Sequence, residues 1–126
     1  MTTGDRFISG GFRAADVIEA LDGDPPELAL FTTYTFSPDA FEDQYLRPLQ
    51  RLGCRRIVVL ADPVCLAQSF EQAGATTGIG SDYYLRQVDG WAAYHAKIAL
   101  LQTPSRSVVA VSSGNLTVAG LLGCVW

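Results

Sequence analysis

One histidine and one lysine occur in this 126-residue chain, and they stand two residues apart, at His95 and Lys97. The segment 94–101 is otherwise mostly apolar and predicts a β-strand, in which residues i and i+2 point to the same face. An imidazole would then lie beside a positive charge. This pair suits phosphate chemistry, because the imidazole nitrogen can attack phosphorus and the cation stabilises the oxygens on which charge builds.

A second segment carries further polar groups. An apolar, β-branched run at residues 107–111 is followed by a polar turn formed by Ser112, Ser113, Gly114 and Asn115. This pattern predicts a strand, a turn and the start of a helix. The intervening Thr-Pro-Ser-Arg of residues 103–106 predicts a tight turn. The two strands would therefore form a hairpin that brings Asn115 beside His95.

Both segments also have an ordinary structural interpretation. Lys97 would be an outward-facing strand charge, and His95 a hydrogen-bonded core residue. Asn115 would be the N-cap of the following helix, which is compatible with a second role at a site. Backbone N–H groups of residues 112–114 would form a seat for phosphate at that helix start. We favour the catalytic interpretation, mainly because of the second segment and also because a lysine on a mostly apolar strand face needs a reason.

Together the two segments resemble the phospholipase D superfamily, whose signature is His-x-Lys followed by Gly-Ser/Thr-x-Asn-Leu-Thr and Gly-Leu. The matching residues are His95-Ala96-Lys97, Ser112-Ser113-Gly114-Asn115-Leu116-Thr117 and Gly120-Leu121. The resemblance covers residues 28–122 and is specific over 94–121. The lipase branch has an Asp five residues after the Lys, where this chain has Gln102. The remaining pattern is similar to the branch of tyrosyl-DNA phosphodiesterases and phospholipase-D-type restriction nucleases.

The resemblance implies hydrolysis of a phosphodiester without a metal or another cofactor. His95 would form a phosphohistidine, and Lys97 and Asn115 would hold the non-bridging oxygens. The substrate phosphate would also contact three residues of the polar turn, namely Ser113, Ser112 and Gly114. The mechanism needs a second histidine to protonate the leaving oxygen. Since the chain has one, the resemblance implies a homodimer that places two copies of the motif face to face.

We expect the substrate to be a nucleic acid. The alternative is a catalytically incomplete phospholipase-D-like module that binds phosphate, nucleic acid or a protein partner. Gln102, the missing second motif and the net charge of −4 favour this alternative. A phospholipase is a weaker third interpretation, because the Asp of that branch is missing and no interfacial amphipathic helix is evident.

The elements that would position these segments follow an α/β pattern. Apolar runs predict strands at residues 28–36, 56–61 and 81–88, and helical spacing predicts helices at 38–52 and 62–73. With the hairpin and a last helix, the order is β-α-β-α-β-β-β-α, with parallel, right-handed first crossovers. The resemblance implies an α/β/α sandwich around a mixed sheet. The continuous apolar run at 56–61 is typical of a strand covered on both faces.

The chain divides into an N-terminal segment and one phospholipase-D-like half-domain. The segment, residues 1–27, carries a short helix at 13–21 and an irregular stretch or small strand at 8–12. The half-domain is expected at residues 28–126. Its apolar end, residues 121–126, suggests a chain that continues or a terminus that packs at an interface.

Composition narrows the partners and the compartment. A hydrophobic fraction of 48% and a charged fraction of 17% are typical of a folded domain. The net charge argues against a surface that binds nucleic acid throughout. No run is as long as a membrane span and no signal peptide begins the chain, so we expect no membrane association. Three cysteines without ligand spacing indicate reduced thiols and a cytoplasmic location.

The clusters of charged residues along the sequence have simple explanations. Four of the arginines lie within ten residues, at Arg47, Arg51, Arg55 and Arg56. Stabilisation of a helix C-terminus is the simpler explanation for them, and contact with a phosphate backbone is the alternative. Three acids lie in the first part of the 38–52 helix, where the helix dipole favours negative charge: Asp39, Glu42 and Asp43. Residues 78–80, Gly-Ile-Gly, are not predicted to form a phosphate loop.

Overall fold

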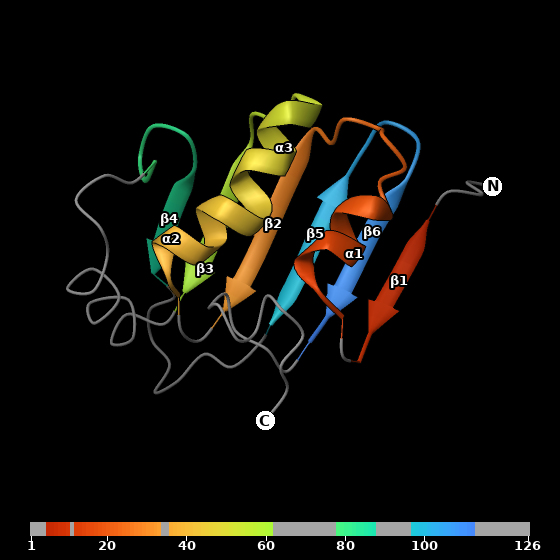
Figure 1. The fold of residues 1–126 in the computed structure, drawn as a ribbon, viewed down its shortest axis with the longest axis horizontal. Coiled ribbons are helices and arrows are strands. Elements are labelled where there is room, and N and C mark those ends of the chain that lie inside the picture. Colours follow the sequence, from red (N-terminus) through yellow and green to blue (C-terminus); the bar gives the residue numbers. More distant parts are fainter. Residues whose placement is uncertain (1–4, 11, 34–35, 62–77, 88–96, 113–126) are drawn as a thin grey trace.

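Strands in the described part of the chain form one mixed, six-stranded sheet (Figure 1). The computed structural model describes residues 5–10, 12–33, 36–61, 78–87 and 97–112. The strands are β1 (Arg6–Ser9), β2 (Leu28–Thr33), β3 (Ile57–Ala61), β4 (Tyr84–Gln87), β5 (Ile98–Gln102) and β6 (Ser107–Val111). Their order across the sheet is β1-β6-β5-β2-β3-β4. Only β5 runs antiparallel to its neighbours, and the other described pairs are parallel.

The predicted helix at 38–52 is confirmed as one helical segment with three parts. These are α2 (Pro38–Phe41), a π-helical turn η1 (Glu42–Leu46) and α3 (Arg47–Leu52). Pro38 occupies the first turn, where its missing N–H costs no hydrogen bond. The segment ends at Gly53, whose φ of 95° is one that glycine adopts without strain. The predicted N-terminal helix is α1 (Ala14–Glu19).

One face of the sheet carries the core. Alternate residues of the central strands point to this face and are buried, with Phe31 of β2 at its centre. The Phe31 ring lies 5.1 Å from that of Phe41 and 4.6 Å from that of Tyr45, measured between centroids. Val17 of α1 and Leu49 of α3 are fully buried in the same cluster. The described helices therefore all pack on the Phe31 face (Figure 1).

On the opposite face, the side chains of the described strands are less buried. Val58 and Leu60 of β3 are half-buried, and Phe7 and Tyr84 on the edge strands are 71% and 54% exposed. The described helices cover the Phe31 face of β3, and the predicted helix at 62–73 lies outside the described residues, so the coverage of β3 on both faces stays a prediction. The described helices lie on one face because the chain adds β1, β2 and β3 to the sheet in the same direction across it. Right-handed crossovers then place α1 and the 38–52 helix on the same face.

Several predicted elements have different ends or lie outside the described residues. β2 ends at Thr33 and β4 begins at Tyr84. The N-terminal strand is β1, which pairs with β6 at the sheet edge. The predicted helices at 62–73 and after residue 115 lie outside the described residues. Among the described residues, no helix is both long and apolar enough to span a membrane.

Candidate functional site

The two segments that predict phosphate chemistry meet at one end of the β5–β6 hairpin. The strands pair from Ile98 opposite Val111 to Gln102 opposite Ser107. One residue beyond, the Ser112 N–H donates to the Lys97 carbonyl at 3.0 Å. The predicted hairpin is therefore present, with its turn at residues 103–106. Lys97 and Ser112 lie opposite each other at the open end of the hairpin.

Lys97 does not lie within the strand as predicted. β5 begins at Ile98, and Lys97 is the half-buried residue before it. The hydrogen bond from Ser112 nevertheless continues the hairpin pairing by one residue. Within β5 the expected alternation is present, since Ala99 and Leu101 are buried whereas Ile98 is 39% exposed. His95, Ser113, Gly114 and Asn115 lie outside the described residues.

The hairpin end lies at the edge of the sheet where the parallel strands finish. β5 runs antiparallel to β2 and β6, so Lys97 at its start is level with the carboxyl ends of β2, β3 and β6. In α/β sheets this edge is the usual place for a ligand. Lys97 and Ser112 thus lie at the edge of the sheet where α/β proteins usually bind ligands.

A threonine that the sequence analysis did not single out connects this edge to the central strand. Thr32 of β2 is opposite Ile98 in the antiparallel register, and its Oγ1 accepts the Ile98 N–H at 2.8 Å. The neighbouring Thr33 is fully buried. The sequence signal was the pair of threonines that ends the apolar run 28–31. Thr32 therefore helps to hold the start of β5, and with it Lys97, in place.

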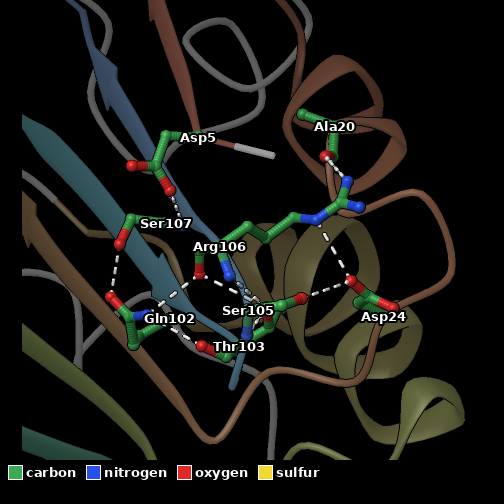
Figure 2. A network of polar contacts seen from close by, with 8 residues as sticks. All are labelled: Asp5, Ala20, Asp24, Gln102, Thr103, Ser105, Arg106 and Ser107. Atoms are coloured by element: carbon green, nitrogen blue, oxygen red, sulfur yellow. Dashed lines mark hydrogen bonds and ion pairs between the residues drawn. The ribbon is translucent and has the colours of Figure 1, made fainter. Parts of the chain in front are cut away.

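Gln102, where the resembled lipase branch has Asp, lies at the other end of β5 and builds the hairpin turn (Figure 2). Its Nε2 donates to the carbonyls of Thr103 at 2.7 Å and of Arg106 at 3.0 Å. Its Oε1 accepts from the Ser107 hydroxyl. The amide thus supplies two donors and an acceptor that a carboxylate could not supply together.

The same turn is tied to the N-terminal part of the chain (Figure 2). The Arg106 guanidinium forms an ion pair with Asp24, with Nε 3.1 Å from Oδ2, and its Nη1 donates to the Ala20 carbonyl at 3.5 Å. The Ser107 N–H donates to Asp5 Oδ1 at 2.9 Å. These contacts hold the end of the hairpin that lies away from Lys97.

Glu42 has a structural role that helix-dipole reasoning did not predict. Its Oε2 accepts the Gly78 N–H at 2.9 Å and the Tyr83 hydroxyl at 3.0 Å. Burial, and then the hydrogen bond to Glu42, raise the pKa of Tyr83. A Cβ on Gly78 would lie 2.6 Å from an oxygen of Asp82, so a larger residue here would require the Asp82 side chain to shift. The Gly78 N–H therefore faces a carboxylate, as expected for a segment that is not a phosphate loop.

The described residues contain no further cluster with obvious chemistry. No group of three or more His, Cys, Asp or Glu side chains gathers there as metal ligands would. Cys54 is buried and unpaired, and burial raises the pKa of its thiol. Its Sγ lies 3.8 Å from the Arg56 carbonyl. A buried thiol of raised pKa is a poor nucleophile, so Cys54 is part of the core.

Comparisons with protein-family models, with curated proteins and with solved structures find no match to this chain.

Proposed function

We propose that this chain is a phospholipase-D-like domain, an α/β/α sandwich, that hydrolyses phosphodiester bonds without a metal ion. The observation that supports this function best is the Ser112–Lys97 hydrogen bond, which joins the two motif segments at the ligand-binding edge of the sheet. In the sequence, His95 is two residues before Lys97, and Asn115 is three residues after Ser112.

In the proposed reaction, an imidazole nitrogen of His95 attacks phosphorus and the bond to the leaving oxygen breaks. Lys97 and Asn115 stabilise the negative charge on the non-bridging oxygens. The hydroxyls of Ser112 and Ser113 and the backbone N–H of Gly114 bind the same phosphate. A second histidine protonates the leaving oxygen. It then removes a proton from water, which attacks the phosphohistidine and releases free His95 and a phosphomonoester.

The second histidine comes from another copy of the chain, since the sequence contains one. We therefore propose a homodimer as the active form and a nucleic acid as the substrate. A cytoplasmic location is part of the same proposal. The unpaired thiol of Cys54 supports it, because reduced cysteines are typical of that compartment.

The test is hydrolysis of bis(p-nitrophenyl) phosphate by the full chain, with and without EDTA. We expect turnover in EDTA, because Lys97 rather than a metal supplies the cation. Lys97→Ala should lower kcat about 100-fold, as loss of one charge-stabilising group does. Arg86→Ala, at an exposed arginine of β4, is the matched control and should leave kcat unchanged. Activity that EDTA abolishes and a divalent ion restores would contradict the proposed roles.

The second candidate is a module that binds phosphate groups without hydrolysing them. The single histidine favours it, because one chain alone lacks a group to protonate the leaving oxygen. Gln102 favours it as well, since this residue builds a turn here. Phosphodiester binding that Lys97→Ala weakens, with no turnover by the wild type at any protein concentration, would select this candidate.

A further inference from the structure

Three exposed arginines lie at one corner of the molecule, where α3 ends and β3 begins. Arg51 is in the last turn of α3, and Arg55 and Arg56 directly precede β3. We refer to Arg51, Arg55 and Arg56 as the arginine corner. It lies at the amino ends of the parallel strands, so the length of β3, about 17 Å, separates it from the edge that holds Lys97.

Helix-dipole stabilisation explains only one of these arginines. The helix ends in a turn in which the Gly53 N–H donates to the Gln50 carbonyl and the Cys54 N–H to the Leu49 carbonyl, both at 3.0 Å. Arg51 lies within the last helical turn and can interact with the negative end of the dipole. Arg55 and Arg56 lie beyond this end, and the dipole effect falls off within the last turn.

Local acids do not neutralise the corner. Three of the other described arginines form ion pairs, namely Arg106 with Asp24, Arg47 with Asp43 and Arg13 with Asp16. In the part of the chain that the structure describes, the side chains of Arg51, Arg55 and Arg56 make no hydrogen bond or ion pair. The nearest acid by strand register is Glu27, since Ala29 is opposite Ile57 in the parallel β2–β3 ladder. No contact joins its carboxylate to the corner among these residues.

An exposed, unpaired group of guanidinium ions in a chain of net charge −4 suits a polyanion. We propose that the arginine corner binds the phosphate backbone of a nucleic acid, outside the candidate site. The choice of a nucleic acid among polyanions rests on the proposed function. Contacts there would position the strand without reading its sequence, while the Lys97 edge contacts the phosphodiester that is cleaved.

The experiment measures binding of a fluorescein-labelled 30-base-pair DNA duplex by anisotropy, at a series of salt concentrations. The test variant carries Arg51→Ser, Arg55→Ser and Arg56→Ser. The control variant carries Arg6→Ser, Arg13→Ser and Arg86→Ser, three exposed arginines elsewhere. Each variant lowers the net charge by three. Thermal unfolding verifies that both are folded.

We expect the test variant to bind at least 10-fold more weakly than the wild type. The slope of log K against log salt should fall by about 2–3, because each lost phosphate contact removes about 0.9. The control variant should retain the wild-type slope. The inference would be overturned if both variants lost DNA affinity equally, if the test variant bound DNA as tightly as the wild type, or if the wild type did not bind DNA. Binding through the corner without any hydrolysis would instead refute the proposed catalytic function alone.

Discussion

At the scale of single residues, the candidate site depends on how the start of β5 is held. The Lys97 carbonyl accepts from Ser112, and the next N–H, that of Ile98, donates to the Thr32 side chain. Two different neighbouring segments thus hold adjacent residues. These two bonds fix the backbone from which the Lys97 side chain extends, and charges in fixed positions stabilise a transition state most effectively.

His95→Ala should abolish turnover with little loss of stability, because the proposed role places the imidazole at a site open to solvent. Asn115→Ala should lower both the turnover rate and the stability, since loss of a helix N-cap costs about 1 kcal/mol. Thermal midpoints measured alongside rates separate the two effects. If His95→Ala unfolds the domain while the remaining folded molecules turn over normally, the histidine is a core residue and the phosphodiesterase proposal fails.

Tyr83 should make the fold sensitive to alkaline pH. Its pKa is raised by burial and by Glu42, so the folded state favours the protonated phenol. The stabilisation is complete below the unfolded pKa of about 10 and is lost as pH rises above it. Burial raises the pKa of Tyr45 in the same direction. We therefore expect the thermal midpoint to fall from about pH 10 upward.

Tyr83→Phe tests this assignment. It removes a hydrogen bond to a carboxylate, which should lower the free energy of unfolding by about 2 kcal/mol at pH 7. It should also reduce the decrease of the thermal midpoint above pH 10. Tyr84→Phe is the matched control, because Tyr84 is 54% exposed and adjacent in sequence. Thermal unfolding between pH 7 and 11 provides the measurement. An alkaline profile that is the same in Tyr83→Phe and in the wild type would show that Tyr83 does not cause the sensitivity.

At the scale of elements, hydrogen bonds and an ion pair hold the β5–β6 hairpin at both of its ends. Its open end carries Lys97 and Ser112, and its turn is closed by Gln102 and attached to the rest of the chain through Arg106 and Asp24. Because the strands are only five residues long, a loosened turn would disturb the pairing that aligns the open end. The turn therefore contributes to the candidate site without touching it.

Gln102→Ala should lower the free energy of unfolding by about 2 kcal/mol, because it leaves part-buried carbonyl and hydroxyl groups without their partner. Gln102→Asp should also lose stability and gain no activity, although Asp is the residue of the resembled lipase branch. Urea denaturation and specific activity are the measurements, with Ser105→Ala in the exposed part of the turn as control. A stable and more active Gln102→Asp protein would show that this position serves the reaction directly.

At the scale of the whole molecule, the described helices pack on one face of the sheet, and apolar side chains remain exposed on the other. Ile98 and Val111, a directly opposed pair that is 39% exposed at each residue, lie next to Lys97 and Ser112. Single exposed apolar side chains are common on protein surfaces, so this pair does not by itself indicate a contact region.

We expect a homodimer in which the two His95 side chains lie near the two-fold axis. Light scattering coupled to size-exclusion chromatography gives the mass in solution, and His95→Cys tests the arrangement through disulfide formation under mild oxidation. Ser81→Cys, at an exposed turn residue, is the control and should not crosslink. A monomer at all concentrations, or a dimer in which only the control crosslinks, would contradict the shared site and favour the binding module.

Residue patterns along the chain were sufficient to predict most of the local structure of the described residues. Periodicity predicted the strands around Phe31, Val59 and Leu101 and the helix that carries Phe41 and Leu49, because apolar spacing follows directly from strand and helix geometry. It also predicted the hairpin that brings Lys97 and Ser112 together, since a four-residue turn leaves two adjacent strands few alternatives.

The face that the described helices cover and the partners of the polar residues depend on how distant parts of the chain come together. The described helices cover one face because β1, β2 and β3 are added to the sheet in the same direction, and a single strand's apolar pattern does not contain this information. The partners of Glu42 are 36 and 41 residues away, and Thr32 bonds to a residue 66 positions away. Such contacts depend on how distant segments come together, so residue type and local spacing alone did not reveal them.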